Sequence, residues 1–259
     1  MNYRLVPSRG RLNTHRNRLL SKPGLSGKLH TVKPMFLYMI LYLISFMLIE
    51  HWNRLHYTVI HTAVDDLIPF RPVFVIPYML WFPFVTVSVL FLLMKNEDAY
   101  HRLCSTLMFG MTVFILVSVV FPNIHLMRPE TMPDESVFSR MVTLVYTVDT
   151  PTNLTPSIHV YNSLAVVASM WNWDWRTDDG FSYSGPARAF WRTIVTSLGL
   201  LISVSTMLIK QHSFSDVVIA AGLFVFFYAL VYRFNIVLTG SSARRERRRP
   251  ALRPRSARS

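Results

Sequence analysis

Six long windows of this sequence contain no Asp, Glu, Lys or Arg, and a chain that carries them must keep them out of water. A transmembrane helix needs about 20 mostly apolar residues to cross a hydrocarbon core about 30 Å thick. Aromatic or basic residues flank the shorter windows and can lie at a membrane interface. The sequence therefore predicts an all-α, polytopic membrane protein, a bundle of six transmembrane helices. The windows are residues 34–49, 72–94, 103–127, 150–173, 193–209 and 217–232.

Positive charge gathers at the two ends of the chain. The formal net charge is +13, and residues 1–33 and 240–259 each hold eight Lys or Arg, against a single acid. Basic segments beside membrane spans mark the cytoplasmic side, and an even number of spans returns the chain to that side. We expect two disordered cytoplasmic tails that contact anionic lipid headgroups and no nucleic acid, on either side of a membrane domain at 34–239.

Three polar segments lie at the ends of the apolar windows. They are Arg128-Pro129, residues 156–159 and residues 210–216. With both termini in the cytoplasm, all three fall on the outward face. Ionisable groups near hydrocarbon are costly unless they pair or line a cavity, so these segments predict one site on the extracytoplasmic side.

The residue types in these segments suit phosphoryl transfer. His212 and Asp216 are four residues apart and share a helix face. A carboxylate there fixes the tautomer of the imidazole and leaves the other ring nitrogen free to attack. His159 is a candidate general acid. Arg128 and Lys210 supply cations that grip phosphate oxygens, so no metal or cofactor is required.

Simpler interpretations stay open at this stage. A single histidine can be merely wetted at the membrane interface, and His212 with Asp216 can be a helix-stabilising pair. Two histidines and an aspartate can also bind zinc, which predicts inhibition by chelators and leaves the nearby cations unexplained. Asp65 and Asp66 are interpreted as acids that solubilise an outward loop, in preference to contacts with a substrate headgroup.

Together the three segments resemble the signature of the type 2 phosphatidic acid phosphatase superfamily, membrane lipid phosphatases related to vanadium haloperoxidases. That signature reads K-x6-R-P, then P-S-G-H, then S-R-x5-H-x3-D, on a six-helix core. The chain is similar in order and spacing, with Arg128-Pro129, residues 156–159, and Ser205 followed by His212 and Asp216. The resemblance spans roughly residues 35–238.

The resemblance implies a role for each matched residue. His212 would form a phosphohistidine, Asp216 would orient it, and His159 would protonate the leaving alkoxide. The substrate would be a phosphorylated membrane lipid such as a phosphatidate or an isoprenyl diphosphate. The residues implied or expected to bind phosphate are Arg128, Lys210, Ser157 and Ser205.

Three departures from the signature qualify the resemblance. Phe121, Ile158 and Thr206 stand where the family has Lys, Gly and Arg. Lys210, one helical turn beyond Thr206, is expected to restore one lost cation. The departures resemble the inositol phosphorylceramide synthase-like branch, in which a lipid alcohol accepts the phosphoryl group. We therefore weigh a lipid phosphatase first, a lipid phosphotransferase second, and a catalytically silent scaffold or transporter third.

Overall fold

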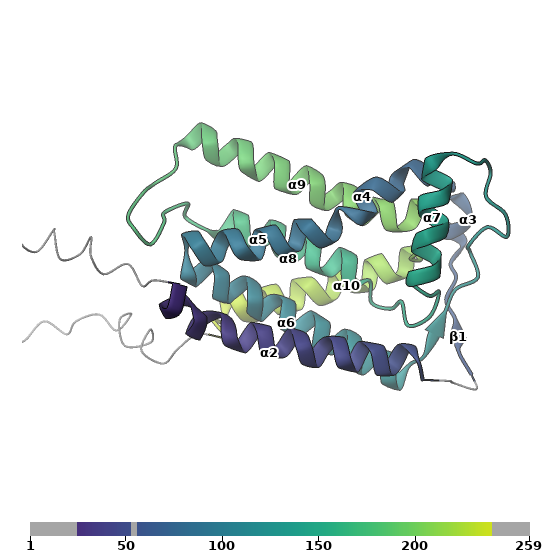
Figure 1. Ribbon diagram of the computed structural model, residues 1–259, viewed down its shortest axis with the longest axis horizontal. Coiled ribbons are helices and arrows are strands. Elements are labelled where there is room, and N and C mark those ends of the chain that lie inside the picture. Colours follow the sequence, from purple (N-terminus) through teal and green to yellow (C-terminus); the bar gives the residue numbers. More distant parts are fainter. Residues whose placement is uncertain (1–24, 53–55, 240–259) are drawn as a thin grey trace, which may run out of the picture.

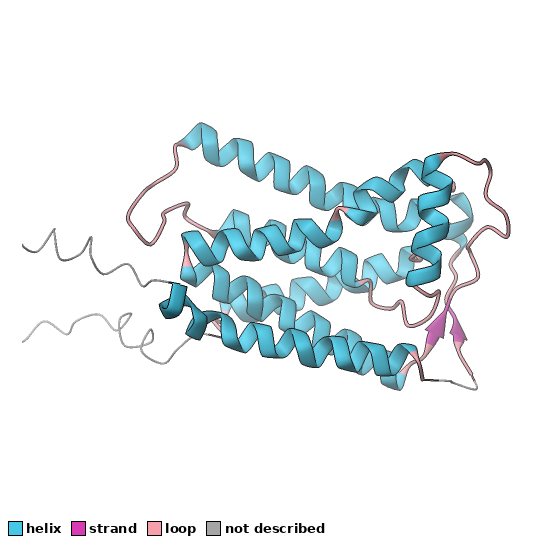
Figure 2. Cartoon of the chain, viewed as in Figure 1, coloured by secondary structure: helices cyan, strands magenta, loops and turns pink. Residues whose placement is uncertain are grey.

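The computed structural model describes residues 25–52 and 56–239, and within them the protein is a helical bundle with two short strands (Figures 1 and 2). Strands β1 (Thr58–Val59) and β2 (Asn123–Ile124) pair in parallel beside one end of the bundle. A 3-10 turn at Pro72–Phe74 and a π-helix at Ala229–Arg233 complete the regular structure. The α-helices are α2 (Leu25–Glu50), α3 (Ala63–Leu67), α4 (Val75–Met79), α5 (Trp81–Lys95), α6 (Glu97–Val120), α7 (Val137–Val148), α8 (Ile158–Asn172), α9 (Gly185–Leu208) and α10 (Phe214–Tyr228).

Five helical stretches of the described chain are long and apolar enough to cross a membrane, which confirms an all-α polytopic protein. The fourth predicted window is not one of them. Residues 150–157 form a loop, because Pro151 and Pro156 disfavour helix before them, and helix α8 has only 15 residues. At 1.5 Å per residue it is about 22 Å long, less than the hydrocarbon core. The five stretches are Lys28–Glu50, Pro72–Lys95, Glu97–Val120, Gly185–Leu208 and Phe214–Arg233.

The bounds of two helices also differ from those of the predicted windows. Helix α6 begins at Glu97, before the third window, because the Asn96 side chain accepts a hydrogen bond from the backbone of Ala99 and caps the helix. It ends at Val120, since Pro122 follows and cannot continue it. Helix α2 already includes residues 25–33, so that part of the predicted N-terminal tail is helical. The predicted disorder of residues 1–24 and of the tail 240–259 lies outside the described residues.

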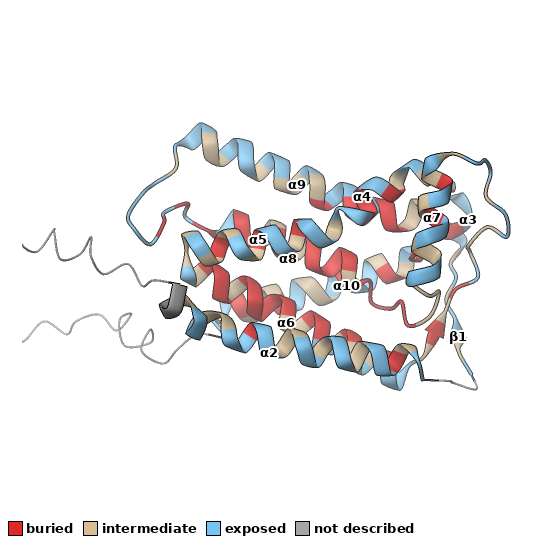
Figure 3. Cartoon of the chain, viewed as in Figure 1, coloured by how far each residue is buried: buried red, intermediate tan, exposed pale blue. Residues whose placement is uncertain are grey.

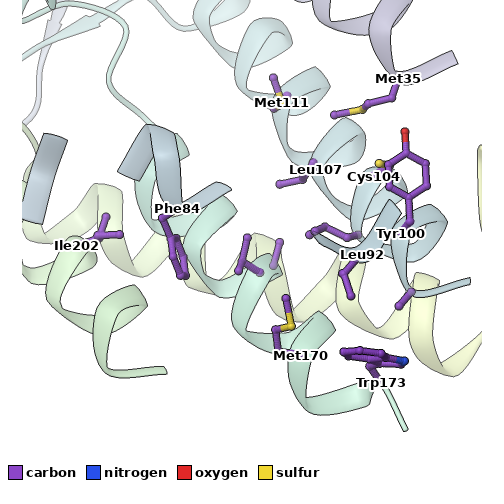
Figure 4. Packing of buried hydrophobic residues seen from close by; sticks show 14 of the residues in the cluster. Met35, Phe84, Leu92, Tyr100, Cys104, Leu107, Met111, Met170, Trp173 and Ile202 are labelled. Atoms are coloured by element: carbon purple, nitrogen blue, oxygen red, sulfur yellow. The ribbon is translucent and has the colours of Figure 1, made fainter. Parts of the chain in front are cut away.

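Helix α8 lies at the centre of the bundle, against α5, α6, α9 and α10. Figure 3 shows its buried residues in red, between helices whose outer faces are exposed. Phe84 of α5, Leu107 of α6, Met170 of α8 and Ile202 of α9 belong to one cluster of buried hydrophobic residues around it (Figure 4). The exposed outer faces carry large apolar side chains, such as Leu37 of α2, which is 68% exposed. Apolar surface of this extent fits a lipid environment.

The two ends of the bundle differ in what they carry. The first turns of α2 and the end of α10 lie at one end, while α3, α7, β1 and the turn between α9 and α10 lie at the other (Figure 1). The chain therefore returns to its starting end. The predicted functional segments gather at the opposite end.

A close helix contact gives a test of this packing. A Cβ added to Gly110 of α6 would lie 2.0 Å from the Tyr161 ring of α8. That ring is buried, and its hydroxyl donates to the Thr106 carbonyl at 2.8 Å, so it cannot move aside easily. We expect Gly110→Ala to lower the free energy of unfolding by about 1–3 kcal/mol, measured in detergent. The control Gly222→Ala, whose Cβ meets nothing within 4 Å, should not be destabilised; equal stability losses would contradict the packing.

Candidate active site

The structure brings both predicted histidines and the aspartate together. His159 Nδ1 lies 3.3 Å from His212 Nε2, and His212 Nδ1 lies 3.5 Å from an Asp216 carboxylate oxygen. The three residues are 9%, 4% and 0% exposed, respectively. Asp216 also accepts hydrogen bonds from the Thr155 hydroxyl and, at 2.9 Å, from the Ser213 backbone N–H. The carboxylate is thus fixed in place independently of His212.

Local sequence explains this arrangement. Ser213 is the N-cap of α10 and forms a capping box with Asp216, the third residue of the helix. His212 precedes the cap, in the turn between α9 and α10. Lys210, with φ of 53°, adopts the left-handed conformation that lets the chain reverse. His159 lies in the first turn of α8, where Ser157 is the N-cap.

The contacts also indicate where the protons lie. At 3.5 Å the Asp216 carboxylate, which can only accept when ionised, lies beside Nδ1 of His212 without forming a hydrogen bond in this geometry. It favours the tautomer that carries the hydrogen on Nδ1 and the lone pair on Nε2. His159 Nδ1 must then be the donor in the contact between the two rings. His212 Nε2 is therefore placed as a nucleophile, with a proton donor directly beside it.

Two aromatic rings that the sequence analysis missed enclose His159. The ring centroid of Tyr78 lies 4.6 Å from that of His159, and the centroid of Trp81 lies 4.4 Å away. The indole Nε1 of Trp81 is buried and has no hydrogen-bond partner among the described residues. The sequence held one sign of this contact. Tyr78 and Trp81 are three residues apart in the second window, a spacing that places both side chains on one helical face.

Arg128 reaches the same end of the bundle. Its guanidinium donates at 2.5 Å to the side-chain oxygen of Gln211, the residue before His212, and to the backbone carbonyls of Asp149 and Tyr146. Burial lowers the pKa of Arg128, and the nearby Asp149 carboxylate opposes that shift. Its Nε atom is buried and has no partner within the described chain. The guanidinium that contacts Gln211 thus keeps one N–H group without a partner in the described chain.

Lys210 makes different contacts from those expected of a phosphate ligand. Its ammonium group donates to the backbone carbonyl of Asp65 at 2.8 Å and to that of Ile68 at 2.6 Å. Burial lowers the pKa of Lys210, while the negative charges of Asp65 and Asp66 act to raise it. The prediction that Lys210 binds phosphate has no support in these contacts.

The two predicted phosphate-binding serines are engaged with helix backbone. Ser205 is fully buried in α9, and its hydroxyl donates to the Ile202 carbonyl at 2.6 Å. Ser157, also fully buried, accepts at 3.4 Å from the Val160 N–H as the cap of α8. Both lie at the correct end of the bundle, but each hydroxyl already serves its own helix.

Two of the positions that depart from the signature take structural roles. Phe121 caps the C-terminus of α6 with a half-exposed side chain. The Thr206 carbonyl accepts the backbone N–H groups of Gln211 and His212 at 2.9 and 3.1 Å. Through its backbone, Thr206 therefore shapes the turn that contains His212.

The interpretation of Asp65 as a solvated loop acid was wrong. Asp65 is 2% exposed, and its carboxylate accepts from the Ser213 hydroxyl at 2.6 Å and the Phe214 N–H at 2.7 Å. Its neighbour Asp66 is exposed and pairs with the exposed His61 at 2.9 Å. The two acids differ in exposure because α3 directs only Asp65 toward the start of α10.

Comparison with protein-family models, curated proteins and solved structures found no match. Within residues 25–52 and 56–239, no group of three or more His, Cys, Asp or Glu side chains is arranged to hold a metal ion.

A pocket of about 420 Å³ lies at the other end of the bundle. It is lined by polar residues that include Asn96, Asp98 and Arg102 of the α5–α6 region and Asn172 at the end of α8. Its lining includes none of the residues of the histidine site, so this pocket and the site are separate features.

His125 is another buried histidine, and the sequence analysis missed it. Its Nε2 donates to the Gln211 carbonyl at 2.6 Å, and its Nδ1 has no partner among the described residues. Burial lowers its pKa from the ordinary 6.5, against the opposing effect of the bond to Gln211. The signal in the sequence was its position three residues before Arg128.

The lowered pKa of His125 predicts a pH dependence of stability. The unfolded chain takes up the proton first, so this contribution is present above about pH 6.5 and is lost as the pH falls through the folded value. We expect His125→Gln, which keeps a neutral donor, to melt with a weaker acid dependence than the wild type. The control His61→Gln should keep the full dependence; identical profiles for the wild type and His125→Gln would contradict a neutral buried His125.

Proposed function

We propose that the protein is an integral membrane phosphatase that hydrolyses a phosphorylated lipid through a phosphohistidine on His212. The observation that carries this proposal is the pair of contacts that His212 makes, with Asp216 on one ring nitrogen and with His159 on the other. It combines an orienting carboxylate, a nucleophilic nitrogen and a proton donor in one buried set, which is the logic of a catalytic triad.

The first step transfers the phosphoryl group to the enzyme. The lone pair of His212 Nε2 attacks phosphorus, an N–P bond forms, and the bond from phosphorus to the leaving oxygen breaks. His159, in the imidazolium form that the negative phosphate favours, gives a proton to the leaving oxygen and becomes neutral. Because the two ring nitrogens lie 3.3 Å apart, the phosphoryl group enters by separating the rings.

Water completes the reaction. Neutral His159 takes a proton from water as the water oxygen attacks phosphorus, and the N–P bond breaks. Inorganic phosphate leaves, and the lone pair of His212 Nε2 is restored. Asp216 stays beside Nδ1 and stabilises the positive charge on the phosphorylated ring.

Two buried N–H groups support an anionic ligand at this site. Arg128 Nε and Trp81 Nε1 have no hydrogen-bond partner among the described residues. A buried donor without a partner costs about 1–3 kcal/mol, which a phosphate oxygen can recover. Arg128 also supplies the positive charge that balances the equatorial oxygens during transfer.

The surroundings of Trp81 support a lipid as the substrate. Its ring packs on His159, while its neighbours Leu80 and Phe82 are 41% and 68% exposed on the outer face of the bundle. His159 therefore lies close to an apolar part of the outer surface. A phosphate head can therefore reach the site while hydrocarbon chains stay in the bilayer.

The basic ends of the sequence support an outward orientation of the site. Residues 1–33 and 240–259 are expected on the cytoplasmic side. The described chain begins and ends at the end of the bundle away from the turn between α9 and α10, which contains His212 (Figure 1). The proposed active site therefore faces the extracytoplasmic side.

Phosphate release by the purified protein tests the proposal. The panel is a phosphatidate, an isoprenyl diphosphate and a sphingoid phosphate, each with and without chelator. We expect release by the wild type, and loss of roughly a thousandfold or more in His212→Ala because the nucleophile is gone. His61→Ala, an exposed histidine, is the matched control and should retain activity.

The assay also separates the alternatives. Equal release by the wild type and His212→Ala removes the phosphohistidine mechanism, and inhibition by chelator favours a zinc site. Activity that requires an added alcohol acceptor identifies a lipid phosphotransferase. No turnover of any lipid phosphate leaves the scaffold or transporter hypothesis.

The role of Arg128 gives an independent test. Lysine retains the charge but cannot donate at once to Gln211, the loop carbonyls and a phosphate. We expect Arg128→Lys to lower kcat/KM roughly 10- to 100-fold, the effect of losing one or two charged hydrogen bonds. The control is Arg140→Lys. Arg140 lies on α7, and its exposed side chain pairs with Glu135. Equal kcat/KM in both variants would falsify the phosphate-binding role.

A further inference from the structure

Asp65 contacts the chain on both sides of the proposed nucleophile. Its carboxylate accepts from the Ser213 hydroxyl and the Phe214 N–H, one and two residues after His212. Its backbone carbonyl accepts from the ammonium group of Lys210, two residues before His212. Helix α3 therefore holds the 210–214 turn at three points.

The Asp65 carboxylate is itself fixed within α3. The backbone N–H and the hydroxyl of Thr62 both donate to it at 2.8 Å. With Ser213 and Phe214, four donors surround the group. Burial acts to raise the pKa of Asp65, but these hydrogen bonds outweigh it and hold the pKa below the ordinary value. The group is therefore an anion beside the N-terminus of α10, where negative charge is favourable.

Besides the bonds to the Thr206 carbonyl, the contacts with α3 hold a turn that contains one costly backbone conformation. Lys210 is left-handed, a conformation that costs energy in a residue with a side chain and persists only when neighbours enforce it. The direction of the His212 ring depends on this turn, since Asp216 and His159 lie on separate helices. A shift of about 1 Å in a reacting group can cost roughly a hundredfold in rate.

We propose that Asp65 is a positioning residue for His212, which it holds in line with Asp216 and His159 by clamping the turn between α9 and α10. The proposal rests on the proposed function. It gives a role to an acid that lies about 150 residues from the nucleophile in sequence and to the Lys210 contacts that phosphate binding does not explain. Asp65 acts through the turn and does not touch the substrate.

The test compares Asp65→Asn with Asp66→Asn in the full-length protein. Both substitutions remove one negative charge from α3. The Asp66 carboxylate, however, is exposed, and within the described chain its hydrogen bond is to His61. We expect kcat to fall roughly 10- to 100-fold in Asp65→Asn, with KM changed less than about threefold because the phosphate ligands are untouched. Asp66→Asn should match the wild type.

Phosphoenzyme formation distinguishes positioning from a loss of folded protein. In a rapid-quench experiment, partial unfolding reduces the burst amplitude and leaves the rate constant unchanged. We expect Asp65→Asn to reduce the rate constant. A reduced amplitude with a wild-type rate constant overturns the proposal.

Ser213→Ala tests the same link if Asp65→Asn does not fold. It removes one of the bonds to Asp65, and we expect a smaller drop in the same rate constant. Its control is Ser136→Ala, which removes the N-cap of α7 away from the turn. Where both single variants fold, their effects should be less than additive in the double variant, because they break one contact.

The outcomes separate this proposal from the proposed function. No His212-dependent turnover in the wild type overturns both. Turnover in the wild type, with Asp65→Asn equal to Asp66→Asn, overturns only the positioning role. Full additivity of Asp65→Asn and Ser213→Ala also overturns it, since independent effects exclude a shared clamp.

Discussion

The buried carboxylate of Asp216 is the interaction on which the functional end of the bundle depends. It caps α10 through the Ser213 N–H, accepts from the Thr155 hydroxyl and faces His212. The backbone carbonyl of Asp216 also accepts the N–H of Ser157 at the start of α8. One residue therefore joins the beginnings of two helices, and an unpaired carboxylate in this position would be strongly destabilising.

The sequence was sufficient for the features that depend on local spacing. Uncharged windows predicted a helical membrane protein, and the four-residue spacing of His212 and Asp216 predicted their contact. The fourth window misled because hydropathy alone does not register Pro156, so a loop was included in a span. Helix α8 is apolar because it is buried between other helices, a cause that composition cannot distinguish from contact with lipid.

Features that depend on distant partners could not be predicted. Asp65 and Ser213 are 148 residues apart, and Lys210 meets Asp65 across 145 residues. Nothing local marks such pairs: a lysine beside a histidine looks like a phosphate ligand, and adjacent acids in a loop look solvated. Only the packing of α3 against the turn shows that one acid is buried and the other is exposed.

A capping box alone would account for Asp216, so the His-x3-Asp pattern does not by itself indicate catalysis. Buried polar atoms that fold stability does not require indicate a ligand site more strongly. Arg128 Nε, Trp81 Nε1 and His125 Nδ1 lack partners within the described chain and lie around the two histidines. Apolar residues at these positions would avoid that cost. Polar groups kept at the expense of stability are expected where a ligand completes their hydrogen bonds. Arg128 Nε and Trp81 Nε1 are donors, which suits an anionic ligand.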